Sequence, residues 1–269
     1  MQTPLLPSPV RRIARGLSLV EVAVVLLILT ILVAAVGFPL AAHVEARRSQ
    51  ETQRHLELVK EAIYGFAIAN GRLPCPASAS SSAQESFCTN DSPTICGAER
   101  VGIYSANGRC FARDGFVPAR TLALTPVDSQ GYLQDAWADG TTARRVRYAI
   151  SAASVGTTTN VLTRTDGIRT ATMGGVSGLS NLIHVCATGL TTSPPTANCG
   201  TVSELTKMAP FVVYSPGKDT LATQFDSANN RNGDIVYTSG AATATFDDLV
   251  TWGSLNVLCG RMVQAGRLS

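Results

Sequence analysis

Charged side chains are scarce in this sequence of 269 residues, of which 15% are charged and 45% are hydrophobic. The formal net charge is +3, but Arg11, Arg12 and Arg15 all precede Leu17 and no acidic residue does, so the charges from Leu17 onward sum to 3 − 3 = 0. A protein that binds nucleic acid through its folded domain needs a basic face on that domain. The lack of net charge beyond the basic tail therefore argues against nucleic acid as a partner.

Motifs of catalysis and of metal binding are also missing. No G-x-S-x-G occurs, no two cysteines form a C-x-x-C pair, and "SPGKD" lacks the upstream glycine of a phosphate loop. His43 and His55 are about 18 Å apart on one expected helix, so they cannot share a metal ion. His184 and Cys186 share a strand face and could form half a metal site, but ordinary packing accounts for them as well. The sequence thus predicts no enzyme activity and no cofactor, and it assigns no metal ligands among the histidines and cysteines.

The longest apolar run is Leu17 to Phe38, 22 residues that directly follow the basic tail and Gly16. A helix of about 20 residues matches the roughly 30 Å hydrocarbon core of a bilayer, so the run predicts a transmembrane helix. Arginines precede the run and charges of mixed sign follow it, which predicts a cytoplasmic N-terminus and an external remainder. A cleaved secretory signal would have a shorter apolar core, and a plain uncleaved anchor leaves the carboxylate of Glu21 unexplained.

Gly16, Leu17 and Glu21, followed by an uninterrupted apolar run, resemble the N-terminal signal of type IV pilins and type II secretion pseudopilins. The resemblance implies that a prepilin peptidase cuts between Gly16 and Leu17 and methylates the new amine. It also implies that Glu21 is the fifth mature residue, whose carboxylate can neutralise the Leu17 amine of a neighbouring subunit in a bundle of helices. The resemblance thus implies that Gly16 and Leu17 flank the cleavage site and that Glu21 takes part in the assembly of subunits.

Apolar residues recur at helical spacing after the run, at Leu56, Val59 and Ile63. They indicate that the helix continues in amphipathic form until Gly71, where "LPCP" cannot extend it. The expected organisation is a leader over 1–16, a transmembrane helix over 17–38, its amphipathic continuation over 39–71 and a globular head over 72–269.

Beyond Gly71 the sequence changes to turn residues and short β-branched or aromatic stretches. Two stretches rich in small polar residues, 77–93 and 156–175, predict exposed loops. We expect strands at 145–151, 182–187, 211–215 and 234–238. A last helix should begin after Ser254 and end near Gly266, with an apolar stripe of Leu255, Leu258, Cys259 and Met262. The predicted fold class is α+β, with the long N-terminal helix packed on a small antiparallel sheet in a pilin-like head.

Seven cysteines predict an exported, oxidised head, because disulfides persist outside the reducing cytoplasm. With one cysteine left over, they allow 7 × 15 = 105 pairings, so the sequence does not determine the connectivity. We expect the first four to pair among themselves, the next two to pair with each other, and Cys259 to be a buried thiol. The disulfide candidates are Cys75, Cys88, Cys96, Cys110, Cys186 and Cys199.

Acidic residues gather around an Asn/Gly-rich segment near the C-terminus, at Asp219, Asp226, Asp234, Asp247 and Asp248. Calcium binds carboxylate and carbonyl oxygens of such loops. The segment resembles the calcium-binding loop of major pseudopilins, because Asp247 and Asp248 precede Trp252, although the spacing differs and glycines are sparser. A calcium site and a set of turn-forming Asp and Asn residues are both open alternatives.

The resemblance implies a structural subunit of a type IV pilus or type II secretion pseudopilus, and the length and irregular loops favour a minor subunit. Its partners would be prepilin peptidase, other pilin-like subunits and the bacterial inner membrane, with the head in the periplasm. Pilus, secretion and DNA-uptake systems are equally open. The alternative is an uncleaved single-pass surface or binding protein.

Overall fold

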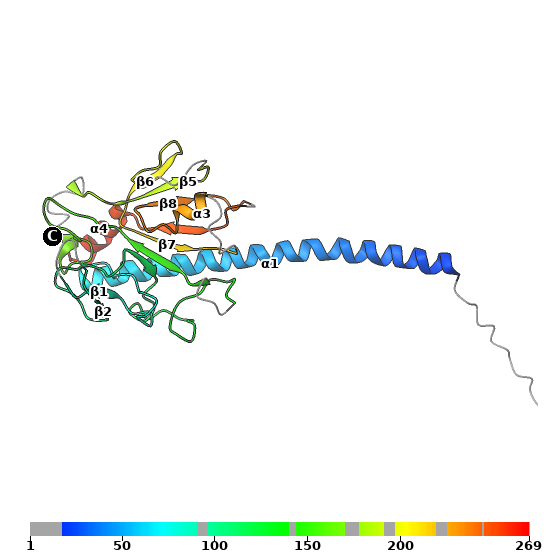
Figure 1. Cartoon of the computed structure of the whole chain (residues 1–269), viewed down its shortest axis with the longest axis horizontal. Helices are drawn as coiled ribbons and strands as arrows, with labels where there is room; N and C mark the ends of the chain where they lie inside the picture. Colours follow the sequence, from blue (N-terminus) through cyan, green and yellow to red (C-terminus); the bar gives the residue numbers. More distant parts are fainter. Residues whose placement is uncertain are drawn as a thin grey trace, which may run out of the picture. The chain divides into compact units, whose positions relative to one another are not determined.

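The computed structural model describes residues 18–90, 96–139, 144–169, 178–190, 197–218, 225–243 and 245–268, without the side chains at 34–41. Its first element is helix α1 (Leu19–Asn70), which has 52 residues (Figure 1). The chain divides into two compact units, Met1–Arg47 and Arg48–Ser269. The C-terminal part of α1 therefore belongs to the second unit, which we call the head.

The structure corrects the expected transmembrane helix over 17–38. Among the described residues, no helix is long and apolar enough to cross a membrane. The single-pass inner-membrane location that followed from that span is corrected with it.

Helix α1 ends where a glycine follows it, as predicted. Gly71 adopts a left-handed conformation with φ of 68°, and its N–H donates to the carbonyl oxygen of Ala67 at 2.8 Å. Glycine adopts this conformation without the steric cost that a Cβ atom would add. The chain therefore leaves the helix at Gly71 and continues into the loops and strands of the head.

Two larger sheets and one small ribbon form the β-structure of the described residues. The first sheet is antiparallel, with β3 (Asp114–Phe116), β4 (Arg147–Ile150), β7 (Phe211–Ser215) and β9 (Leu249–Trp252) in that order. The second has the order β6 (Glu204–Ala209), β5 (Ile183–Ala187) and β8 (Val236–Ser239), and β5 pairs with β8 in parallel. The ribbon joins β1 (Ser86–Cys88) and β2 (Glu99–Val101).

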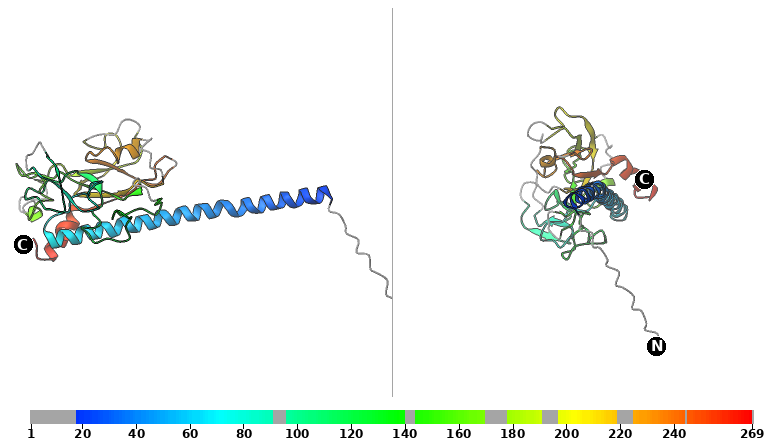
Figure 2. Two further views of the ribbon diagram at one scale, coloured as in Figure 1. Left: turned by 60° about the horizontal axis from the view of Figure 1, so that its bottom comes forward. Right: turned by 90° about the vertical axis from the view of Figure 1, so that its right-hand side faces the viewer.

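The central strands of the first sheet are buried on both faces, because successive side chains in a strand point to opposite sides. Tyr148 and Val213 belong to the core cluster that contains the buried face of α1, with Leu56, Val59 and Ile63. Their neighbours belong to a second cluster with the other sheet, formed by Ala149, Val212 and Tyr214 together with Ile183, Val185 and Tyr237. The head therefore has three layers, which are α1, the first sheet and the second sheet (Figure 2).

This layering corrects the predicted fold class. One small antiparallel sheet on a helix would leave the far face of the sheet exposed, whereas Val212 and Tyr214 are fully buried there. The second sheet covers that face and contains a parallel strand pair, so the head is a mixed α/β structure with several sheets. The four predicted strands correspond to β4, β5, β7 and β8, and the remaining strands were not predicted.

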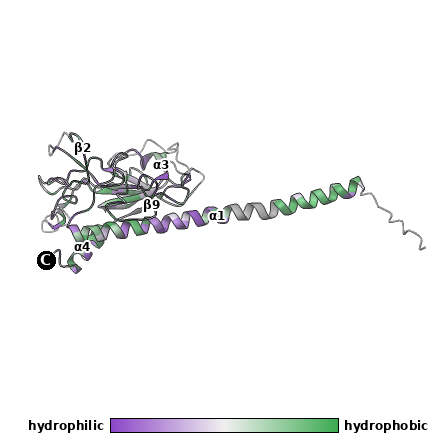
Figure 3. Ribbon diagram, turned by 90° about the horizontal axis from the view of Figure 1, so that it is seen from below, coloured by the Kyte–Doolittle hydropathy of each residue, from purple (hydrophilic) through white to green (hydrophobic). Residues whose placement is uncertain are grey.

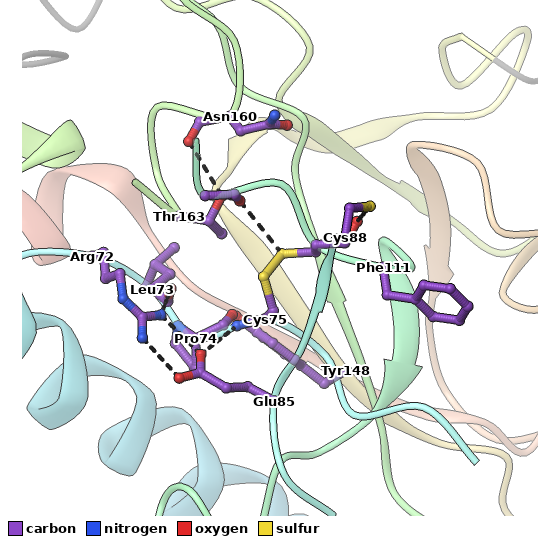
Figure 4. Close-up of a disulfide and its surroundings, with 12 residues drawn as sticks. Arg72, Leu73, Pro74, Cys75, Glu85, Cys88, Phe111, Tyr148, Asn160 and Thr163 are labelled. Atoms are coloured by element: carbon purple, nitrogen blue, oxygen red, sulfur yellow. Dashed lines mark hydrogen bonds and ion pairs between the residues drawn. A yellow bond between two sulfur atoms is a disulfide. The ribbon is translucent and has the colours of Figure 1, made fainter. Parts of the chain in front are cut away.

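The two stretches that were predicted to be exposed loops, 77–93 and 156–175, contain residues that are buried in the core of the head. Phe87 is fully buried within the first, and Val161, Leu162 and Ile168 are buried within the second. The first stretch is held inward by Glu85, which accepts hydrogen bonds from Arg72 at 2.7 and 2.8 Å and from the Cys75 N–H at 3.2 Å (Figure 4). Burying a carboxylate is tolerable only with such partners, so the ion pair explains how a polar stretch enters the core.

The C-terminal helix packs beside the head portion of α1. Helix α4 (Leu255–Gln264) buries Leu255, Leu258 and Met262, as the apolar stripe predicted, whereas Cys259 is half-buried. Arg261 of α4 donates to Glu61 of α1 at 2.5 and 2.9 Å. The short helix α3 (Phe225–Asn229) precedes β8.

Candidate functional site

The described chain begins at the first turn of α1, which contains Glu21, the residue that the sequence analysis assigned to assembly. Ser18 precedes the helix, and its backbone carbonyl oxygen accepts a hydrogen bond from the N–H of Val22 at 3.1 Å. Glu21 lies three residues after Ser18, in the first turn. An acidic side chain in the first turn interacts favourably with the positive end of the helix dipole. Gly16 and Leu17, the predicted processing residues, lie outside the described residues.

Fifteen consecutive residues from Leu19 to Val33, which we call the apolar segment, are all exposed. Its large apolar side chains are 43 to 86% exposed, and Figure 3 shows this end of α1 as the most hydrophobic part of the helix. Contiguous apolar surface of this extent is rare on monomeric soluble proteins and marks interaction sites. The apolar segment is therefore the strongest candidate for a functional surface.

The predicted disulfides are present in the head. Cys75 bonds with Cys110, Cys88 with Cys96, and Cys186 with Cys199. The first four cysteines thus pair among themselves, and Cys259 is the free cysteine. Three disulfides indicate an oxidising, extracytoplasmic environment.

The acidic residues near the C-terminus that the structure describes each have their own hydrogen-bond partners. Asp226 accepts the N–H groups of Gly189 and Leu190 at 3.0 to 3.3 Å, and Asp247 accepts the Lys218 N–H at 2.7 Å. Asp219 lies outside the described residues. In the part of the chain that the structure describes, no three Asp, Glu, His or Cys side chains are grouped to hold a metal ion.

Asp234 and Asp248, two further acidic residues of this group, accept hydrogen bonds in a turn and in the buried interior. Asp234 accepts the N–H of Val236 at 2.7 Å, as a turn-forming aspartate does. Asp248 is fully buried and accepts hydrogen bonds from Asn230 at 2.9 Å and Arg231 at 3.3 Å. Burial raises the pKa of Asp248 to about 6, although Asn230 and Arg231 oppose the shift.

His184 does not form the half-site with Cys186 that its spacing allowed. The Cys186 sulfur is consumed by its bond with Cys199, so no thiolate is available to a metal. The Nδ1 atom of His184 instead lies 2.5 Å from the Oε1 atom of Glu204 on the neighbouring strand. This pair explains His184 by packing and hydrogen bonding within the second sheet.

Sequence reasoning missed a buried polar cluster between the two larger sheets. Asp114 on β3 accepts from the hydroxyls of Tyr214 at 2.9 Å and Tyr237 at 3.0 Å, and it forms an ion pair with Arg147. Burial raises the pKa of Asp114, while the charge of Arg147 lowers it. Asp114 is the first residue of a strand of only three residues, so its sequence context carries no periodic signal that could have revealed its partners.

The hydrogen bonds of Asp114 connect the first sheet with the second sheet. Arg147 and Tyr214 lie on β4 and β7 of the first sheet, whereas Tyr237 lies on β8 of the second. One carboxylate thereby satisfies donors from both layers, which is required because an unpaired buried donor is costly.

The chain was also compared with known proteins. No family model, no curated protein and no solved structure matches it.

Proposed function

We propose that this chain is a structural, non-enzymatic subunit of a type IV pilus or type II secretion pseudopilus, processed after Gly16 and assembled through the apolar segment. The observation that carries the proposal is the exposure of that segment on a long helix whose other part belongs to a disulfide-bonded head. The irregular, loop-rich head favours a minor subunit.

The distribution of apolar residues around the helix indicates how many neighbours the segment needs. Residues 24–29 are six consecutive Val, Leu and Ile residues, each 48 to 61% exposed. Successive helical residues are about 100° apart, so six of them cover every side of the helix. A single partner would cover one side, whereas a filament packs several helices around each subunit. This pattern supports a multi-helix assembly over a simple dimer.

Glu21 fits the same assembly through its charge. Cleavage after Gly16 would leave a new ammonium group at Leu17, one helical turn from Glu21. In a bundle, the Leu17 ammonium of one subunit can neutralise the Glu21 carboxylate of the next. Because a charge buried without a partner is strongly destabilising, the pair would fix the register of neighbouring helices.

The alternative of an uncleaved single-pass anchor gives the carboxylate of Glu21 no role, whereas the filament proposal pairs that carboxylate with a neighbouring amine.

The decisive test compares Glu21→Gln with Glu51→Gln. Both changes remove one exposed carboxylate from α1 and keep the side-chain shape, but only Glu21 lies in the apolar segment. We expect Glu21→Gln to reduce crosslinking to other pilin-like subunits about tenfold or more, and Glu51→Gln to leave it unchanged. Cleavage, which depends on Gly16, should continue in both and is checked on the same gel. Wild-type crosslinking of Glu21→Gln would refute the charge-pair role.

The intact mass of the purified protein tests the processing step separately. The proposal expects a chain that begins at Leu17 and carries one methyl group on its amine. A chain that still contains Met1, or one that begins after Ala42, would refute the pilin assignment.

A further inference from the structure

A groove of about 380 Å³ lies in the head beside strand β6 and the start of helix α4. Binding sites in proteins are typically clefts of about 300 to 1,000 Å³. Part of the lining consists of four consecutive residues of β6, and the rest comes from the end of β9 and the first residues of α4. The lining residues are Leu205, Thr206, Lys207, Met208, Trp252, Ser254, Leu255 and Asn256.

Strand β6 is the terminal strand of the second sheet, so one of its edges pairs with no other described strand (Figure 1). Four residues of an extended strand measure about 13 Å, so the groove follows β6 far enough to hold a short extended segment. Extended segments of partner proteins commonly dock beside an open strand edge, where pockets for their side chains give specificity.

The edge of β6 does not suit every strand. The register between β6 and β5 shifts at two places, between Ile183 and Val185 and between Val185 and Cys186, and β6 also carries Lys207. Bulges and a lysine on an edge strand discourage indiscriminate pairing with other strands. An occupant of the groove must therefore be recognised through its side chains and not through backbone hydrogen bonds alone.

The charge of the groove favours one class of occupant. Lys207 is exposed and pairs with no acidic side chain of the described residues. No acidic residue is among the described residues that line the groove. Glu204, the acidic residue of β6, is not part of the lining and pairs with His184. An acidic side chain in the groove would therefore meet a free positive charge without a competing negative one.

Apolar side chains lie beside this charge. Leu205 is 49% exposed. Met208 and Trp252 are half-buried, because each packs on one side against a core cluster of the head and also lines the groove. An apolar side chain placed in the groove would remove part of this surface from water, which is favourable.

We propose that this groove binds an extended segment of a partner protein in which acidic and apolar side chains alternate. An acidic side chain of the segment would pair with Lys207, and its apolar side chains would cover Leu205 and Trp252. The proposal does not rest on the filament function, because all these residues belong to the head.

The test is calorimetric titration of the purified, oxidised full-length chain with three hexapeptides that have blocked ends. In these peptides valine alternates with glutamate, with glutamine or with lysine. We expect the glutamate peptide to bind saturably and the lysine peptide to bind about tenfold or more weakly, because like charges repel at a contact. The glutamine peptide should fall between them.

Tryptophan fluorescence tests whether the peptide binds in the groove. The chain has two tryptophans, Trp137 and Trp252, and only Trp252 lines the groove. In the Trp137→Phe variant, the glutamate peptide should therefore change the fluorescence of Trp252 over the same concentrations that produce heat in the titration.

Lys207→Glu tests the ion pair by reversing the charge at an exposed position. This variant should bind the glutamate peptide about tenfold or more weakly than the wild type does, and it should prefer the lysine peptide. A merely structural role of Lys207 would not reverse the preference. The matched control is Arg54→Glu, which reverses a charge at an exposed position of α1 outside the groove and should keep the wild-type preference.

Several results would overturn the proposal. They are the absence of saturable binding by the glutamate peptide, equal binding of all three peptides, an unchanged Trp252 fluorescence, and a wild-type preference in Lys207→Glu. Sedimentation of the chain without peptide tests a different occupant. Self-association that Lys207→Glu abolishes would mean that a second copy of this chain fills the groove, and this result would also overturn the proposal.

Discussion

Replacing Asp114 with alanine tests whether one buried carboxylate holds the two larger sheets together. The Asp114 side chain is 5% exposed and its ion-pair partner Arg147 is 29% exposed. The substitution removes the acceptor of Arg147 and of the hydroxyls of Tyr214 and Tyr237 at once. Breaking a buried ion pair by deleting one partner costs about 3 to 5 kcal/mol, because the other charge stays buried. That is a large share of the roughly 5 to 15 kcal/mol by which domains are stable.

Two further variants separate this effect from generic loss of an acid or of one bond. Tyr237→Phe removes one hydroxyl and leaves Asp114 paired with Arg147 and Tyr214, so it should cost about 1 kcal/mol. Asp139→Ala deletes a carboxylate that is 52% exposed and 3.9 Å from Arg144, so it should cost less than about 1 kcal/mol.

The assay is urea unfolding of the oxidised full-length chain, followed by tryptophan fluorescence and by far-ultraviolet circular dichroism. Coincident transitions from the two probes would justify comparing free energies of unfolding. The reasoning fails if Asp114→Ala costs less than about 1 kcal/mol, or no more than Tyr237→Phe.

Three other predictions concern stability. The pKa of Asp248 is raised from 3.8 to about 6 in the folded state, so between these values the folded protein holds a proton that the unfolded chain releases. The free energy of unfolding of the wild type should therefore fall by about 3 kcal/mol relative to that of Asp248→Asn as the pH rises from 4 to 7. Urea unfolding that gives both proteins the same dependence on pH would contradict this prediction. Replacing Cys75 and Cys110 with alanine opens a loop of 35 residues and should lower the free energy of unfolding by about 4 kcal/mol. Replacing Cys88 and Cys96 opens a loop of 8 residues and should lower it by about 2.5 kcal/mol. Calorimetry that shows the reverse order would contradict the argument from loop entropy. Ile63→Ala in the fully buried face of α1 should cost about 2 to 5 kcal/mol in the same unfolding assay, whereas the exposed Leu58→Ala should cost far less.

Local patterns in the sequence were enough to place several elements. Apolar spacing around Leu56 and Ile63 and the glycine at position 71 defined the buried face and the end of α1, because both signals act within a few residues. The strand β7 was placed at 211–215 because four β-branched or aromatic residues follow a proline. Strand β6 contains Glu204 and Lys207, gave no such pattern and was missed. Strand β9 has β-branched and aromatic residues and was also not predicted.

The sequence by itself also contained the N-terminal pattern on which the proposed function rests, and the number of cysteines. A basic tail, Gly16 and Glu21 in front of an apolar run are recognisable without any structure, since they are contiguous. The number of cysteines predicted an oxidised head, but the bonds between Cys75 and Cys110 and between Cys88 and Cys96 required coordinates. Pairing depends on distances between Cα atoms that sequence spacing does not fix.

Only the tertiary structure decided that the first sheet is covered on both faces. A strand buried on both sides has no polar alternation, so its sequence does not say whether a helix, a sheet or solvent lies beyond it. The partners of Asp114 come from positions 147, 214 and 237. Such groupings arise when strands distant in sequence pair and pack, and the free energy of burying a charge or a hydroxyl is set by those distant neighbours rather than by adjacent residues.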